Sequence, residues 1–187
     1  MLLKKGILFM KLRIVLLAGL FVLAPGCSPK NPGSATAPAA NATPPPASKT
    51  AGPLPDGGFK AQLTFADQQL KLRAGQKESI AVKVKNTSNA IWWQRGGETN
   101  DRPDNKFYIA LGNRWLDKDG KPTSETEGHN GIIKDLKPGE EIEMPLQITA
   151  PKQPGDYTLN LDMVQEGVTW FGERGSPTTK VKVTVVK

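Results

Sequence analysis

Apolar residues alternate with polar ones along most of residues 59–187, and this spacing constrains the fold more than any other feature of the chain. Successive side chains of a β-strand point to opposite faces, so a period of two indicates strands with one buried face. No window shows the period of an amphipathic helix. The alternating rows are Phe59/Ala61/Leu63/Phe65, Leu70/Leu72, Ile80/Val82/Val84, Ile142/Met144/Leu146/Ile148, Tyr157/Leu159/Leu161/Met163 and Val181/Val183/Val185.

Turn residues separate these rows, notably Lys137-Pro138-Gly139-Glu140 and Pro154-Gly155. Seven or more short strands joined by such turns predict an all-β domain, an immunoglobulin-like antiparallel two-sheet sandwich. Tyr157, at the start of a late strand, is placed to form a tyrosine corner, with its hydroxyl bonded to upstream backbone. We also expect a strand over residues 107–116, with a bulge or bend at Gly112.

The N-terminal segment indicates export. Basic residues precede an apolar run of Ile14–Leu23, which is shorter than the roughly twenty residues needed to cross a bilayer. Small residues and Cys27, the single cysteine of the chain, end the run. Leu23-Ala24-Pro25-Gly26-Cys27 resembles the lipobox of bacterial lipoproteins, with Ala24 at the position usually taken by Leu. The alternative is a signal peptide in which the cysteine is incidental. We expect translation to begin at Met10.

The lipobox resemblance implies that residues 1–26 are removed and that Cys27 carries acyl chains, palmitate among them, which anchor the protein to a membrane. Ser28 stands where an Asp commonly retains lipoproteins at the inner membrane, so the outer membrane is favoured in an organism that has one. Residues 27–58 are rich in Pro, Ala, Gly, Ser and Thr and predict a disordered tether. The sequence thus predicts three parts: a signal peptide, a tether and a domain over residues 59–187.

The charge of the chain gives no sign of a nucleic-acid partner. The net charge is +7, but four of the basic residues and none of the acidic ones lie before Cys27. The mature chain then carries about +3, an ordinary charge for solubility. We therefore expect no nucleic-acid binding.

Several motifs of the domain share one family pattern: Asn86-Thr87-Ser88 with Trp92, Leu111–Asp117, Leu136–Glu140, Ala150-Pro151, Pro154–Tyr157 and Glu166–Phe171. They resemble an immunoglobulin-like module of bacteria that is appended to glycosyltransferases and other cell-surface proteins. The same motifs are distantly similar to the tryptophan-containing immunoglobulin-like domain of selective-autophagy receptors, a protein-interaction module. Both resemblances imply the sandwich fold, and neither implies catalytic residues.

Residues with catalytic or metal-binding chemistry are few. His129 is the one histidine, and no cysteine or second histidine is available to complete a zinc site or a triad. Asp117-Lys118-Asp119-Gly120 begins like a calcium loop but lacks the Glu of its twelfth position, so we interpret it as a turn. We expect no enzyme activity, no cofactor and no metal.

Adjacent aromatic residues suggest a binding surface, because neighbours on a strand point to opposite faces. Trp92 is expected inside and Trp93 outside, and Phe171 outside if Trp170 faces inward. The alternative is that these aromatics close the ends of the sandwich beneath their own loops. The candidate binding rim consists of Trp93, Arg95, Glu166, Phe171, Glu173 and Arg174.

These features together predict a lipid-anchored, non-enzymatic binding or scaffold module of the bacterial cell envelope, with a protein partner on the immunoglobulin-like domain. The alternative is a carbohydrate-binding module for cell-surface polysaccharide, since exposed aromatic rings stack on sugars.

Overall fold

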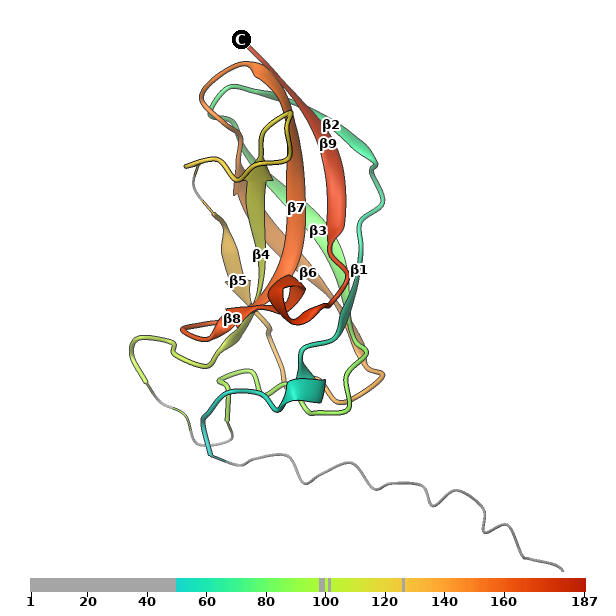
Figure 1. The fold of residues 1–187 in the computed structure, drawn as a ribbon, viewed down its shortest axis with the longest axis vertical. Helices are drawn as coiled ribbons and strands as arrows, with labels where there is room; N and C mark the ends of the chain where they lie inside the picture. Colours follow the sequence, from blue (N-terminus) through green and yellow to red (C-terminus); the bar gives the residue numbers. More distant parts are fainter. Residues whose placement is uncertain (1–49, 98–99, 101, 126) are drawn as a thin grey trace, which may run out of the picture. The chain divides into compact units, whose positions relative to one another are not determined.

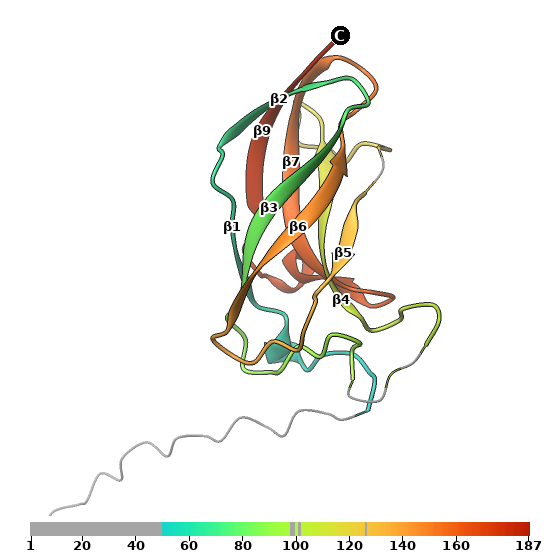
Figure 2. The same cartoon turned by 180° about the vertical axis from the view of Figure 1, so that it is seen from behind.

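The computed structural model describes residues 50–97, 100, 102–125 and 127–187. The described chain forms nine strands and two short 3-10 helices, and the strands lie in two packed layers (Figures 1 and 2). The elements are η1 (Asp56–Gly58), β1 (Ala61–Thr64), β2 (Gln69–Arg73), β3 (Lys77–Asn86), β4 (Ile109–Leu116), β5 (His129–Gly131), β6 (Glu141–Thr149), β7 (Gly155–Gln165), β8 (Thr169–Trp170), η2 (Phe171–Arg174) and β9 (Thr179–Val186).

One layer is a three-stranded sheet in the order β1-β3-β6, which lies in front in Figure 2. The other is a six-stranded sheet in the order β2-β9-β7-β4-β5, with β8 paired to β7. This architecture confirms the predicted immunoglobulin-like two-sheet sandwich. All pairs are antiparallel except β2 with β9, which is parallel because the chain leaves β1 and joins the opposite sheet at its edge.

The core lies between the sheets and contains the predicted alternating rows. In β3, for example, Ile80, Val82 and Val84 are buried while Lys77, Ala81 and Lys83 are exposed. Two tryptophans, Trp92 and Trp115, are among the largest fully buried side chains, which fits the expectation that Trp92 points inward. Each large buried apolar side chain contributes roughly 1.5–3 kcal/mol to the free energy of unfolding, so packing provides most of the stability.

Two predicted local motifs form as expected. Tyr157 makes the tyrosine corner, its hydroxyl donating to the carbonyl of Gln153 at 3.0 Å. Asp117 builds a turn, because its carboxylate accepts from the backbone amides of Asp119 and Lys121, both at 2.9 Å. The residues 117–120 therefore form a turn, as interpreted from the sequence.

Gly112 corrects the expectation of a bulge. The strand β4 pairs with β7 in an unbroken register from Ile109 to Leu116, and Gly112 lies opposite Asp162 within it. A Cβ at this glycine would lie 2.8 Å from the ring of Trp170 and 3.0 Å from that of His129. The absence of a side chain at Gly112 thus lets two rings approach the strand closely. Such an approach is a second common reason for a glycine inside a strand, besides a bulge.

The folded domain includes residues upstream of Phe59, in the segment for which the sequence predicted a disordered tether. Leu54 packs against the core, and its amide donates to Oε1 of Gln165 at 2.9 Å. The carbonyl of Gly58 accepts from the indole Nε1 of Trp92 at 2.9 Å. The predicted signal peptide, Cys27 and the greater part of the tether lie outside the described residues. Among the residues that are described, no helix has the length and apolarity to cross a membrane.

Candidate binding face

The six residues of the candidate rim do not form one surface. Phe171 is fully buried and makes edge-to-face contacts with Phe59 and Trp92, each with ring centroids 5.2 Å apart. Its assignment to an exposed rim is therefore wrong, and the alternative, an aromatic that closes an end of the sandwich, describes it. The cause is local: β8 ends at Trp170, and the 3-10 turn η2 sends the next side chain inward.

The other five rim residues lie in three places. Trp93 is half-buried and Arg95 is exposed, both in the loop that follows β3, close to where the described chain begins (Figure 1). Arg174 is exposed, with its guanidinium carbon 5.4 Å from the centroid of the Phe59 ring. Glu166 and Glu173 instead lie on the outer face of the six-stranded sheet, where both take part in a cluster around Trp170.

The Trp170 cluster consists of Arg114, His129, Asp162, Glu166, Trp170 and Glu173. The guanidinium carbon of Arg114 lies 4.5 Å from the centroid of the Trp170 ring, and His129 meets the same ring edge-to-face at 5.1 Å. Glu173 pairs with Arg114 at 3.3 Å, and Oε1 of Glu166 lies 2.8 Å from Nδ1 of His129. Such cation–π and ion pairs link β4, β5, β7 and β8 and hold the β7–β8 hairpin against the sheet.

Asp162 is the buried member of this cluster, with 1% of its surface exposed. Burial raises the pKa of its carboxyl to about 6, although the backbone amides of Gly172 and Met163 and the charge of Arg114 act in the opposite direction. The amide of Gly172 donates to it at 3.0 Å, and Arg114 lies 3.5 Å from it. These contacts tie η2 to β7, and the burial keeps the carboxylate away from ligands.

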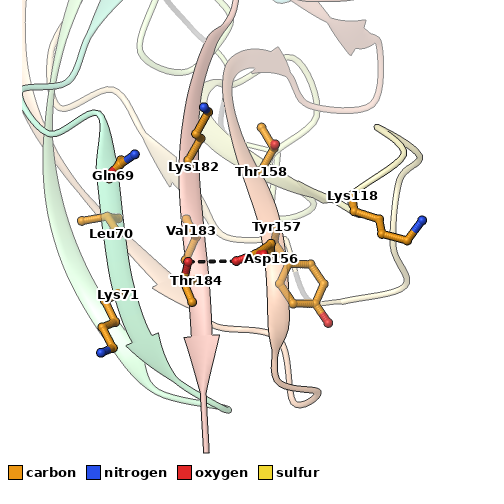
Figure 3. Close-up of a pocket in the computed structure, with 10 residues that line it drawn as sticks. All are labelled: Gln69, Leu70, Lys71, Lys118, Asp156, Tyr157, Thr158, Lys182, Val183 and Thr184. Atoms are coloured by element: carbon orange, nitrogen blue, oxygen red, sulfur yellow. Dashed lines mark hydrogen bonds between the residues drawn. The ribbon is translucent and has the colours of Figure 1, made fainter.

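A groove of about 710 Å³ lies on the same outer face, at the other end of β7 (Figure 3). Strands β2, β9 and β7 form its floor, and Lys118, from the loop after β4, stands at one side. The lining combines Lys71, Lys182 and Lys118 with Thr158 and Thr184, and it includes Tyr157, whose hydroxyl is bonded to the carbonyl of Gln153. Sequence reasoning missed this groove, because the parallel pairing of β2 with β9 brings its residues together and leaves no local signal.

The groove holds three lysines and a single carboxylate. Within the described part of the chain, Lys71 and Lys182 form no ion pair, and Lys118 pairs with its neighbour Asp119. Asp156 is the one carboxylate among the lining residues, and its Oδ1 accepts from the hydroxyl of Thr184 at 2.9 Å. The face therefore offers positive charge that the domain does not neutralise itself.

The described residues hold no group of three or more His, Cys, Asp or Glu side chains arranged to bind a metal ion. His129 lies in β5, an edge strand that the sequence did not predict, with its ring between Glu166 and Glu127.

No family model and no curated protein matches the chain. Among solved structures, the chain is similar to the CARDB domain of the PF1109 protein from Pyrococcus furiosus in complex with di-metal ions, with 16% identity over 68% of this chain and 86% of that one, at a TM-score of 0.34. A β-glucosidase from Listeria innocua in complex with glucose shows 13% identity over 67% of this chain and 16% of that one, at a TM-score of 0.39.

The C-terminal domain of wzt shows 12% identity over 68% of this chain and 71% of that one, at a TM-score of 0.36. Because these TM-scores lie below 0.5, the assignment of the fold rests on the strand order of this chain.

Proposed function

We propose that this protein is a lipid-anchored, non-enzymatic binding module of the bacterial cell envelope, which holds a protein partner on the outer face of its six-stranded sheet. Cys27 is the lipidated residue in this proposal. The groove on that face is the single observation that carries the choice of surface.

The position of the groove supports the proposal. The described chain reaches the domain at the end of β7 that carries Gln165, whose amide donates to the carbonyl of Gly52 at 3.0 Å. Asp156, in the groove, lies at the opposite end of this eleven-residue strand, roughly 30 Å away at about 3.3 Å per residue. A tether attached at one end would leave the groove free to meet a partner at the other.

A carbohydrate ligand is the second candidate function, and one observation favours it. The groove presents the side chains of Gln69, Thr158 and Thr184, polar groups of the kind that bind the hydroxyls of sugars. The earlier reason for this candidate, an exposed Phe171, no longer applies because that ring is buried.

The anchor is tested by the intact mass of the protein extracted from membranes, compared with a Cys27→Ala variant. A mature chain that begins at Cys27 and carries acyl mass supports the anchor. An unmodified chain recovered from the soluble fraction would contradict it.

The binding face is tested by co-purification of envelope proteins with the full chain after chemical crosslinking. We compare a Lys71→Gln/Lys182→Gln variant with a Lys77→Gln/Lys83→Gln variant, which loses the same charge from the three-stranded sheet. Loss of a protein partner with the first variant alone supports the proposal. A partner retained by both, or a polysaccharide recovered in its place, would overturn it.

A further inference from the structure

Cations follow one line along the outer face of the six-stranded sheet. Lys180 and Lys182 project from β9 at alternate positions. The parallel register places Lys71 beside Thr184 and Arg73 beside Val186, so the line continues from β9 onto β2. The two cations on each strand are two residues apart, about 6.6 Å, and the step from Lys182 to Lys71 adds a sideways shift of about 4.8 Å to the neighbouring strand. We call Lys180, Lys182, Lys71 and Arg73 the cation ladder.

The domain does not neutralise the cation ladder. All four side chains belong to exposed residues, and within the described ranges none of them takes part in an ion pair. Strands β2 and β9 contain no acidic residue, and the part of β7 that pairs with β9 contains one, Asp156. Unpaired like charges at this spacing repel one another, so an anionic ligand that binds the ladder would relieve this repulsion.

We propose that the cation ladder binds an acidic segment of the protein partner in an extended conformation, with its carboxylates at alternate positions. This inference rests on the proposed function and names the chemistry of the partner. Alternate side chains of an extended chain point the same way and repeat at about 6.6–6.8 Å, which matches the step within β9 and the step within β2, and the flexible lysine stems span the shift between the strands. Lysines act as point charges on flexible stems, so they accept single carboxylates one at a time.

The test uses the full chain in detergent and a fluorescently labelled peptide in which Glu alternates with Thr. The control peptide has the same residues arranged as one block of Glu and one block of Thr. We expect the alternating peptide to bind more tightly by fluorescence anisotropy, and its affinity to fall roughly tenfold in Lys71→Gln/Lys182→Gln, since this variant loses two exposed ion pairs with the peptide. The matched variant Lys77→Gln/Lys83→Gln should retain the affinity.

Equal binding of the two peptides, or equal loss with both double variants, would overturn the inference, because net charge alone would then explain the binding. Binding of polygalacturonate or of vesicles containing phosphatidylglycerol that needs the ladder lysines, without peptide binding, would likewise overturn it in favour of an acidic glycan or a lipid headgroup. If neither peptide binds while a protein partner still co-purifies through Lys71 and Lys182, the proposed function stands and this inference fails.

Discussion

The lysines on the outer faces of the two sheets have different cross-strand neighbours. On the three-stranded sheet, Lys83 lies opposite Glu143 and Lys85 opposite Glu141, and Lys83 also reaches Glu141 at 3.6 Å. On the six-stranded sheet, Lys180 lies opposite Asn160 and Lys182 opposite Thr158. Cross-strand opposite charges stabilise a sheet. On the first face two lysines therefore have glutamates as cross-strand neighbours, whereas Lys180 and Lys182 on the second face have uncharged ones.

The two faces also differ in what covers them. The three-stranded face is open, whereas the β7–β8 hairpin and η2 fold onto one end of the six-stranded face and bury Asp162. Burial of this carboxylate has a cost in desolvation, which the amides of Gly172 and Met163 and the charge of Arg114 offset in part. The four predictions below test this difference between the faces.

The largest effect is expected from Phe171→Ala. The ring fills the end of the core between Phe59 and Trp92, so its removal leaves a cavity and should lower the free energy of unfolding by about 3–5 kcal/mol. Chemical denaturation measures the change. A loss below about 1 kcal/mol, the range of surface substitutions, would contradict the burial of Phe171 and return it to an exposed rim.

Asp162→Asn should alter the pH dependence of stability. The pKa of Asp162 is raised from its ordinary value of 3.8 to about 6, so the folded protein binds more protons than the unfolded chain between these values. The free energy of unfolding therefore falls as pH rises from about 4 to 6, by at most about 3 kcal/mol at roughly 1.4 kcal/mol per pKa unit. The variant should lose this fall in denaturation curves measured across that range.

The wild type measured over the same pH range provides the reference. A fall in stability of the same size in the variant and in the wild type would show that Asp162 does not titrate in this window.

Gly112→Ala should disturb the Trp170 cluster. The added methyl would lie 2.8 Å from the Trp170 ring, so the hairpin must move outward, at a cost of about 1–3 kcal/mol. Tryptophan fluorescence and denaturation report the change. Gly131→Ala, whose methyl would meet its nearest neighbour at 3.9 Å, is the matched control and should be close to neutral.

The smallest effects concern single lysines. Lys83→Gln removes an ion pair whose side chains are 53% and 50% exposed, so the loss should stay below about 1 kcal/mol and shrink in high salt. Lys182→Gln removes a cation with no such pair and should leave stability unchanged or slightly higher. If Lys182→Gln lowered the free energy of unfolding more than Lys83→Gln did, the difference between the two faces would be contradicted.

The sequence predicted the sandwich well because its alternating rows depend on local spacing. Ile80, Val82 and Val84 had to share a face whatever their partner strands were, and Tyr157 followed a turn with a known geometry. The same spacing failed at Trp170 and Phe171, because the strand ends between them and alternation no longer applies. The sequence predicted a bulge or bend at Gly112 and missed the close approach of Trp170 and His129, because these rings come from distant parts of the chain.

The candidate site was less predictable, since it depends on register. The cation ladder exists because β2 pairs in parallel with β9 and places Lys71 beside Thr184, a relation between residues far apart in the sequence. Trp93 and Arg95 remain candidates from the sequence at the other end of the domain, while Glu166 and Glu173 belong to the Trp170 cluster.

The most direct measurement is photo-crosslinking in living cells from one position on each face. Gln69 lines the groove and Gln62 is exposed on β1 of the three-stranded sheet, so a photoreactive amino acid at either glutamine replaces the same residue type. We predict a discrete crosslinked protein from position 69 and none from position 62. Equal products from both positions, or a product from position 62 alone, would contradict the assignment of the outer face of the six-stranded sheet as the binding face.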